Sequence, residues 1–460
     1  MDQLMQNVRD IQKSLFERRI CDLRIDPGMV EVVPWDQGNP AVEAIPYALK
    51  ELSKKALHYH KREMQLVICG LPGERGDSKY TDCKAAVLHT CDLQIGCPVI
   101  NVSCITKRLL PEGWWQSGGK VGANLAARWR QGGGKSFSKM GDFGPHTEPA
   151  YIQNLLLKFN TRLGGAHTSW EPHQTPTLKE LLDPTIIIGG DCTRPCTGPG
   201  VAAIAGSVEN TFTRYIGRFS RQPFGLGQQE ILHNLKPMTV MMLKEWTAIN
   251  RGVKPVNLIY LRDGVSVGQM DEVLEKEGQA LVDAVQEMDG PGNERTTRIC
   301  IIVICKGHKV HYYPQDERES LNGNPRPGTV VDDPDATDAK LVQFNMIAHA
   351  AIGRKSVKVP SYVCLYDEIW HPREKAYEVP LEHIQHLCFT LCHLYGYCRL
   401  APALPAPVIY AHKVAERGRL YYQHLNNGSD SGSVSSTGDH GDAMSDQLPL
   451  HENIKNTMYW

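Results

Sequence analysis

Two aspartates in this 460-residue sequence follow apolar, β-branched runs and stand beside glycine. The run Thr185–Gly190 leads to Asp191, and its glycine pair predicts that the strand ends and turns there. The run Val256–Arg262 leads to Asp263 and then Gly264. A single aspartate after a strand is commonly a turn cap. Two such strands in one sheet would instead bring two carboxylates together, an arrangement that is costly unless a cation neutralises it, so the pair favours a divalent metal site.

The elements that must position these carboxylates form an ordered series. From about Leu182 the pattern predicts a three-strand antiparallel meander, a helix, a strand, a second helix and a further strand, Arg298–Cys305, an order typical of a ribonuclease H-like mixed sheet. Pro237 is expected to kink or delay the first of these helices, which spans about 228–250.

An earlier part of the chain predicts a separate α/β unit. The strand 65–73, the helical stretch from Tyr80 and the strand from Cys97 have the spacing of a strand–helix–strand unit with a parallel sheet. We therefore expect an entry segment at 1–60, a Rossmann-like domain at 61–181 and a ribonuclease H-like domain at 182–460. A flexible basic insertion is expected at about 107–149 and a disordered segment at about 426–447.

Composition is that of a globular protein, with 41% hydrophobic residues and a net charge of −1. The sequence contains no run of eighteen apolar residues, and its start does not have the pattern of a secretory signal, so we expect a cytoplasmic protein, with the nucleus as the alternative. The fourteen cysteines form no CxxC pair and are interpreted as reduced, buried residues. Gly118-Gly119-Lys120 does not fit a phosphate-binding P-loop.

Several stretches in order resemble the Argonaute family, in its MID and PIWI lobe. They are Gly189–Pro195, Val201–Glu209, Tyr260–Gln269, Leu387–Tyr395, Pro405–His412 and Thr457–Tyr459. This resemblance implies a MID domain followed by a PIWI domain with a ribonuclease H-like active site.

The family's catalytic tetrad would be Asp191, Glu230, Asp263 and His412, with Asp191, Asp263 and His412 as metal ligands. The implied cofactor is Mg²⁺, with Mn²⁺ as the alternative, because hard oxygen ligands suit these ions and two of them can promote in-line phosphodiester hydrolysis. Glu230 can also be read as a helix-capping glutamate, and His412 as a histidine that packs without metal.

The resemblance also implies a pocket for the 5′-phosphate of a guide RNA. Its residues would be Tyr80, Lys84, Gln94, Lys158, Arg162 and Arg417. Tyr80 would stack on the first base and the cations would bind phosphate. A backbone group is the alternative to Gln94, and a solvated charged stripe is the alternative for Lys158 and Arg162.

The implied function is small-RNA-guided gene silencing, in which a 5′-phosphorylated guide RNA directs cleavage of a complementary target RNA. The alternative is a guide-binding scaffold that recruits partners without cutting. Tryptophan-rich silencing proteins are expected to bind the PIWI domain, and we expect a monomer that does not bind membranes. The sequence has no match to a PAZ domain, so it is similar to the C-terminal lobe of the family.

Overall fold

The computed structural model describes most of the chain in separate stretches. They are residues 40–60, 67–69, 78–97, 99–101, 149–171, 175–193, 200–222, 231–290, 292–306, 310–333, 342–351, 356–370, 381–427 and 450–452. Several expectations fall outside them. They are Glu230, residues 1–39 of the entry segment, the basic insertion up to residue 148, most of the segment expected to be disordered, and the match at Thr457–Tyr459. None of the described helices is both long enough and apolar enough to cross a bilayer.

The first unit of the structure is a small α/β arrangement. Strands β1 (Val67–Cys69) and β2 (Val99–Asn101) pair in parallel, and helix α3 (Ser78–His89) with the π-helical segment η3 (Thr90–Ile95) connects them. The predicted strand–helix–strand unit is therefore confirmed. Helix α2 (Pro40–Lys55), which was not predicted, is followed by a π-helical turn (Ala56–His60) and packs on α3.

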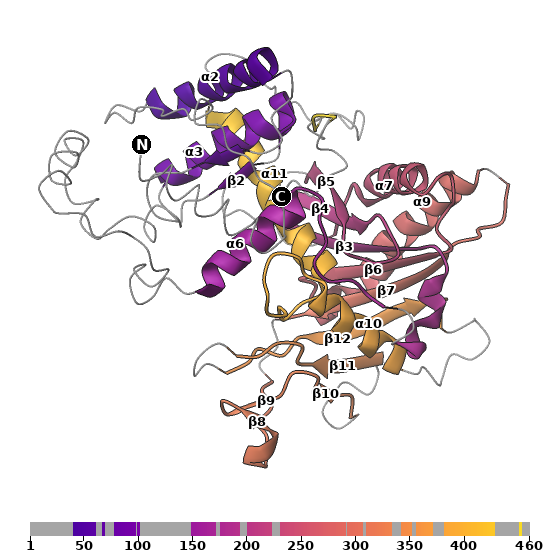
Figure 1. The fold of residues 1–460 in the computed structure, drawn as a ribbon. Helices are drawn as coiled ribbons and strands as arrows, with labels where there is room; N and C mark the ends of the chain where they lie inside the picture. Colours follow the sequence, from indigo (N-terminus) through magenta and orange to yellow (C-terminus); the bar gives the residue numbers. More distant parts are fainter. Residues whose placement is uncertain are drawn as a thin grey trace, which may run out of the picture.

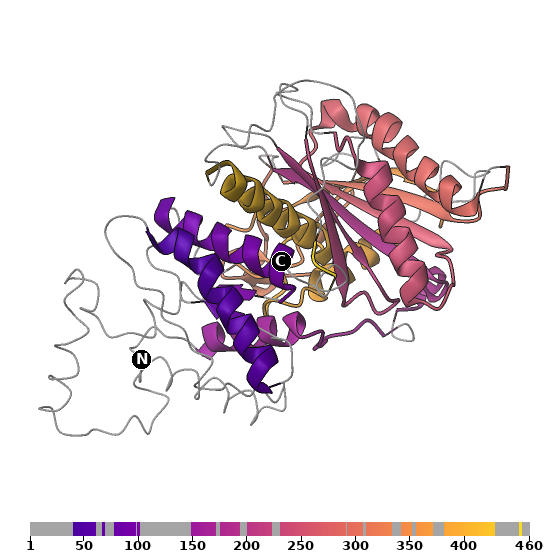
Figure 2. The same ribbon diagram turned by 90° about the horizontal axis from the view of Figure 1, so that it is seen from above.

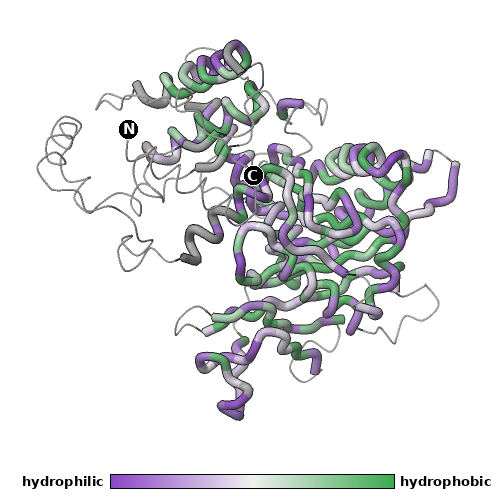
Figure 3. Tube along the Cα trace, viewed as in Figure 1, coloured by the Kyte–Doolittle hydropathy of each residue, from purple (hydrophilic) through white to green (hydrophobic). Residues whose placement is uncertain are grey.

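An eight-stranded mixed sheet forms the centre of the larger unit, in the order β10-β11-β12-β7-β6-β3-β4-β5 (Figure 1). Its strands are β3 (Thr185–Thr193), β4 (Val201–Ser207), β5 (Tyr215–Arg221), β6 (Asn257–Asp263), β7 (Arg298–Cys305), β10 (Val330–Val331), β11 (Val342–Met346) and β12 (Ser361–Asp367). Strands β3, β4 and β5 form the predicted meander, and β3, β6 and β7 run parallel to one another. Most residues of the central strands are buried, and hydrophobic residues run through the sheet and the helices beside it (Figure 3).

Helices cover both faces of this sheet. Helices α7 (Leu235–Ile249) and α9 (Gln279–Asp289) lie on one face, while α10 (Leu381–His393) and α11 (Ala406–Asn427) lie on the other (Figures 1 and 2). Pro237 lies in the first turn of α7, so it delays the helix as expected. Helix α11 continues two residues into the segment expected to be disordered, which corrects that boundary.

The remaining elements are short or peripheral. Helix α6 (Pro149–Arg162) and the 3₁₀ helix η5 (Pro176–Leu182) precede the sheet, and η6 (Val267–Gln269), α8 (Met270–Glu272) and η7 (Val273–Gly278) precede α9. A small hairpin of β8 (Ser320–Leu321) and β9 (Asn324–Pro325) follows the 3₁₀ turn η8 (Glu317–Glu319).

The glycine pair before Asp191 does not end strand β3, so that prediction is wrong. The strand continues through Gly189, Gly190 and Asp191 to Thr193. A Cβ atom at Gly189 would lie 2.2 Å from the backbone carbonyl carbon of Pro407, at the start of α11. The glycine is needed because a helix backbone crosses the strand at close range, a role that sequence alone does not distinguish from a turn.

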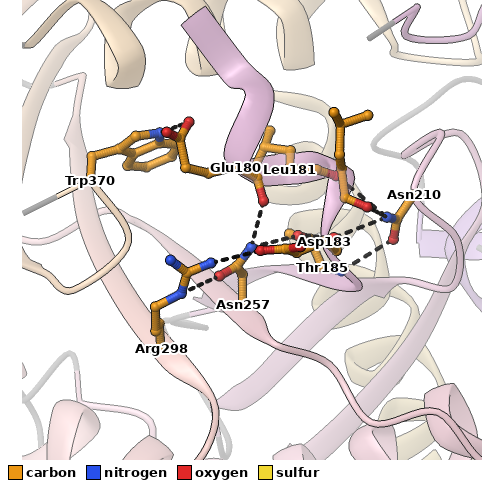
Figure 4. A network of polar contacts seen from close by, with 9 residues as sticks. Glu180, Leu181, Asp183, Thr185, Asn210, Asn257, Arg298 and Trp370 are labelled. Atoms are coloured by element: carbon orange, nitrogen blue, oxygen red, sulfur yellow. Dashed lines mark hydrogen bonds and ion pairs between the residues drawn. The ribbon is translucent and has the colours of Figure 1, made fainter.

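A polar network holds together the opposite, amino-terminal ends of β3, β6 and β7 (Figure 4). The amide nitrogen of buried Asn257 donates to the carbonyl of Glu180 at 2.9 Å and to the hydroxyl of Thr185 at 3.0 Å. Its carbonyl oxygen accepts from Nε of Arg298 at 2.9 Å. Because Arg298 also pairs with Asp183 at 3.1 Å, this network fixes where the three strands start relative to one another.

Candidate active site and anion-binding cluster

The two aspartates lie at the same level of neighbouring parallel strands. In the register of β3 and β6, Gly190 pairs with Arg262, which brings the next residues, Asp191 and Asp263, side by side. Both are buried, and a Cβ atom at Gly264 would lie 3.9 Å from Oδ1 of Asp191. Gly264 has a φ of 83°, which a glycine adopts without strain, and it lets the chain leave the sheet directly after Asp263.

His412 approaches Asp191 from helix α11. Its Nδ1 donates to Oδ2 of Asp191 at 2.7 Å, while the backbone N–H of Cys192 donates to Oδ1 at 2.8 Å. The hydrogen bond to Asp191, aided by Glu416, raises the pKa of His412 to about 10. The carboxylate of Glu416 lies 3.4 Å from Nε2 of His412, and this contact lowers the pKa of Glu416 to about 2.

Asp263 has a different partner, Lys306, which sequence reasoning missed. The Nζ atom of Lys306 lies 2.6 Å from Oδ2 of Asp263. Oδ1 of Asp263 is buried and has no hydrogen-bond partner within the described part of the chain. Burial raises the pKa of Asp263, and the charge of Asp191 adds to this, although Lys306 opposes it. Lys306 directly follows β7, the third of the parallel strands. Its position at the end of a strand, like those of Asp191 and Asp263, could have indicated that it belongs to the site.

These residues fit a divalent cation. Two buried carboxylates converge from adjacent strands, and Oδ1 of Asp263 has no hydrogen-bond partner among the described residues. Carboxylate oxygens of this kind are the hard ligands that Mg²⁺ prefers. Among the described residues, however, no three His, Cys, Asp or Glu side chains are grouped so as to hold an ion. The assignment of Asp191, Asp263 and His412 as metal ligands therefore stays a prediction.

Glu230 itself lies outside the described residues, but the chain just after it is anchored close to Asp263. The backbone N–H of Leu232 donates to Oε1 of buried Glu277 at 2.9 Å. Glu277 also accepts from the Tyr260 hydroxyl at 2.7 Å and from Nε of Arg262 at 3.1 Å. This network ties the residues after Glu230 to strand β6.

A second site gathers positive charge between three helices. Lys84 comes from α3, Lys158 and Arg162 from α6, and Lys413, which sequence reasoning missed, from α11. Burial, followed by the charge of Lys158 and with smaller effects of Arg162 and Lys84, lowers the pKa of Lys413 to about 8. We call these four residues the basic cluster. Cations held this close together favour an anionic ligand.

Aromatic side chains border the basic cluster. The Cζ atom of Arg162 and the Nζ atom of Lys413 each lie 5.8 Å from the centre of the Tyr397 ring. Tyr80 is buried on α3, one helical turn before Lys84. Gln94 is exposed, and its amide nitrogen lies 3.5 Å from Nδ1 of His89.

Arg417, the last predicted phosphate ligand, is held by a buried carboxylate. Its Nε and Nη2 atoms lie 2.5 and 2.7 Å from the two oxygens of Asp92, and its Nε also donates to the Tyr421 hydroxyl at 2.9 Å. Tyr421 donates to Asp92 in turn. Asp92 lies in η3 and Arg417 in α11, so this pair joins the two units of the structure.

Comparisons of the sequence with known proteins identify the family. The Piwi domain family matches residues 137–423, more than half of the chain. Protein argonaute 3 and protein argonaute 2 of Oryza sativa subsp. japonica are each 32% identical to it, over 286 and 281 residues. These alignments cover 60% of this chain but only 24% and 25% of the two relatives, so the chain spans about a quarter of their length.

Two solved structures are similar in fold. The C-terminal lobe of a budding yeast Argonaute has a TM-score of 0.67 and 22% identity, covering 89% of this chain and 71% of that one. Kluyveromyces polysporus Argonaute with a guide RNA has a TM-score of 0.66 and 22% identity, covering 89% and 41%. The fold and the family match define a Piwi-domain protein. The chain belongs to the Argonaute family.

Proposed function

We propose that this chain binds the 5′-phosphate of a small guide RNA and cleaves a complementary target RNA. The observation that carries the proposal is the side-by-side placement of Asp191 and Asp263, with His412 hydrogen-bonded to Asp191. Helix α11 supplies both His412 and Lys413, so the carboxylate site and the basic cluster share one rigid element. The fold similarity to an Argonaute solved with a guide RNA supports RNA as the ligand.

The proposed domains are those expected from the sequence. A Rossmann-like MID domain at 61–181 contributes Lys84 and Lys158, and a ribonuclease H-like PIWI domain at 182–460 contributes the aspartates. The β1–β2 parallel pair and the eight-stranded mixed sheet are consistent with this division.

The proposed chemistry is metal-assisted hydrolysis of a phosphodiester. Bound Mg²⁺, or Mn²⁺, supplies an activated water and stabilises the charge on the leaving oxygen. Asp191 and Asp263 hold negative charge at the sheet edge, and His412, protonated while bonded to Asp191, keeps that carboxylate in one orientation. Glu230 completes the proposed tetrad. In the phosphate pocket, Tyr80 stacks on the first base, and Gln94 and Arg417 join the basic cluster around the phosphate.

A cleavage assay with the complete protein tests this function. A 5′-phosphorylated guide, a paired target and Mg²⁺ should give a guide-dependent product. Asp191→Ala should slow cleavage by more than about 100-fold, because it removes a proposed metal ligand. Loss of a residue that only hydrogen-bonds to such a ligand typically costs about 10- to 100-fold. Asp271→Ala, at an exposed position in α8, is the control and should cleave normally.

The second candidate is a scaffold that binds guide RNA without cutting. The ion pair of Lys306 with Asp263 favours it, since a carboxylate neutralised by lysine does not need a metal ion. If the unaltered protein retains the target through its guide but yields no product in Mg²⁺, the nuclease proposal fails and the scaffold is supported.

A further inference from the structure

Lys306 reaches Asp263 because of the register of two parallel strands. Asp263 in β6 pairs with Ile304 in β7, and Lys306 follows Ile304 by two residues. Alternate residues of an extended chain face the same side, so Lys306 shares the face on which Asp263 stands. Strands β6 and β7 are neighbours in the middle of the sheet (Figure 1). The ammonium of Lys306 thus lies at the carboxyl-terminal ends of the parallel strands, beside Asp263.

The two partners of this ion pair are unequally exposed. The side chain of Asp263 is 4% exposed, whereas that of Lys306 is 46% exposed. The carboxylate is therefore fixed in the protein, while the ammonium, on a flexible stem, can move into water without leaving a buried charge of its own. The ion pair therefore joins a half-exposed ammonium to a buried carboxylate.

The ammonium of Lys306 contacts only one of the two carboxylate oxygens of Asp263. Lys306 contacts Oδ2 of Asp263, but Oδ1 of the same carboxylate is buried without a partner among the described residues, and Asp191 adds negative charge nearby. An ion with two positive charges and several oxygen ligands suits such a pair better than one ammonium does.

We propose that Lys306 occupies the place of a divalent metal ion at Asp263 and competes with that ion for the carboxylate. The inference rests on the proposed metal-dependent function and assigns to Lys306 a role that weakens metal binding when RNA is absent. A metal ion entering the site must displace the ammonium, so the apparent affinity for metal is reduced by the strength of the ion pair.

Metal binding without RNA tests this competition. Mn²⁺ alone is titrated into the full chain, and free Mn²⁺ is followed by its electron paramagnetic resonance signal. Lys306→Met should bind Mn²⁺ about tenfold more tightly than the unaltered protein, a conservative expectation for a pair with one buried partner. Lys306→Gln, a second neutral variant, should behave alike, whereas Lys306→Arg keeps the charge and should not bind Mn²⁺ more tightly.

A matched control is Lys276→Met. Lys276 is 48% exposed and lies 2.6 Å from Glu272, so it resembles Lys306 in exposure and pairing distance but is part of a surface pair on neighbouring turns of helix. This variant should leave Mn²⁺ affinity unchanged, and Asp263→Asn should remove the gain caused by Lys306→Met.

The outcomes separate the two proposals. If the unaltered protein binds Mn²⁺ through Asp263 and the neutral variants bind it equally or more weakly, Lys306 orients Asp263 and competition is refuted, while the metal site stands. If neither the unaltered protein nor any Lys306 variant binds Mn²⁺ in a manner that Asp263→Asn abolishes, the metal site itself is refuted and the competition with it.

Discussion

Asp191 and Asp263 are the same side chain in different surroundings. Both oxygens of Asp191 accept hydrogen bonds, one from His412 and one from the backbone of Cys192. Asp263 has one oxygen paired with the half-exposed side chain of Lys306 and one with no partner among the described residues. Asp191 is therefore held by two hydrogen bonds, whereas Asp263 is held through one oxygen only, as the proposed competition between Lys306 and a metal ion requires.

The basic cluster makes a prediction about individual residues. Lys84→Ala should weaken binding of a 5′-phosphorylated guide by about 10-fold or more, because each charge-assisted hydrogen bond contributes roughly 1.5–3 kcal/mol. Lys413→Met should have a similar effect, since Lys413 lies among the same cations. Fluorescence anisotropy with 5′-phosphorylated and 5′-hydroxyl guides provides the measurement.

The 5′-hydroxyl guide decides what these lysines bind. Its affinity should change much less, and Lys179→Ala, at an exposed position in η5, should affect neither guide. Equal losses for both guides would show that the cluster attracts RNA only through its general charge.

Lys413 and the partner of Arg417 could not be predicted from local sequence. Lys413 stands next to His412, but its surroundings are created by helices α3 and α6, far away in the chain. Arg417 is paired with Asp92, which lies 325 residues earlier. Both environments arise from packing between distant segments, which residue types and spacing do not encode.

Among the elements, the strands that carry the aspartates were predictable because their signal is local. Strands β3, β6 and β7 are apolar runs that are buried over most of their length, and β6 is buried throughout. The glycine pair in β3 was misread because Gly189 makes room for the backbone of α11 and Gly190 for the side chain of Tyr260. Helix α2 was not predicted, and it contains Pro46, a residue that usually argues against a helix interior.

The hydrogen-bond network around Asn257 is expected to fix where β3, β6 and β7 start relative to one another. Asn257→Leu removes three hydrogen bonds and leaves the part-buried guanidinium of Arg298 and the buried Thr185 hydroxyl with fewer partners. We expect a loss of about 2–4 kcal/mol in the free energy of unfolding, measured by urea denaturation. Gln279→Leu, which removes an exposed amide bonded to Asp283, should cost less than about 0.5 kcal/mol. A comparable loss in both variants would mean that the network contributes no more than a surface contact.

At the scale of the whole molecule, α11 belongs to both units. It packs on strands β3 and β4 of the large sheet and on α3 of the small unit (Figure 2). One hydrophobic cluster combines residues of the two units, including Leu49 and Leu88 from the first and Phe219 and Val414 from the second. The site of the aspartates and the basic cluster are therefore joined through a continuous core.

The buried pair of Asp92 and Arg417 is the polar part of this junction, and its removal should loosen the whole molecule. Asp92→Ala leaves a buried guanidinium without its carboxylate, a change that typically costs about 3–5 kcal/mol, so thermal unfolding should begin at a clearly lower temperature. The double variant Asp92→Leu with Arg417→Met should recover most of this loss, because replacing both charges leaves no buried charge unpaired. Asp82→Asn, at the more exposed contact between α3 and Gln423, should change the melting temperature little. If Asp92→Ala melts like the unaltered protein, the two units are held together by their apolar contacts alone.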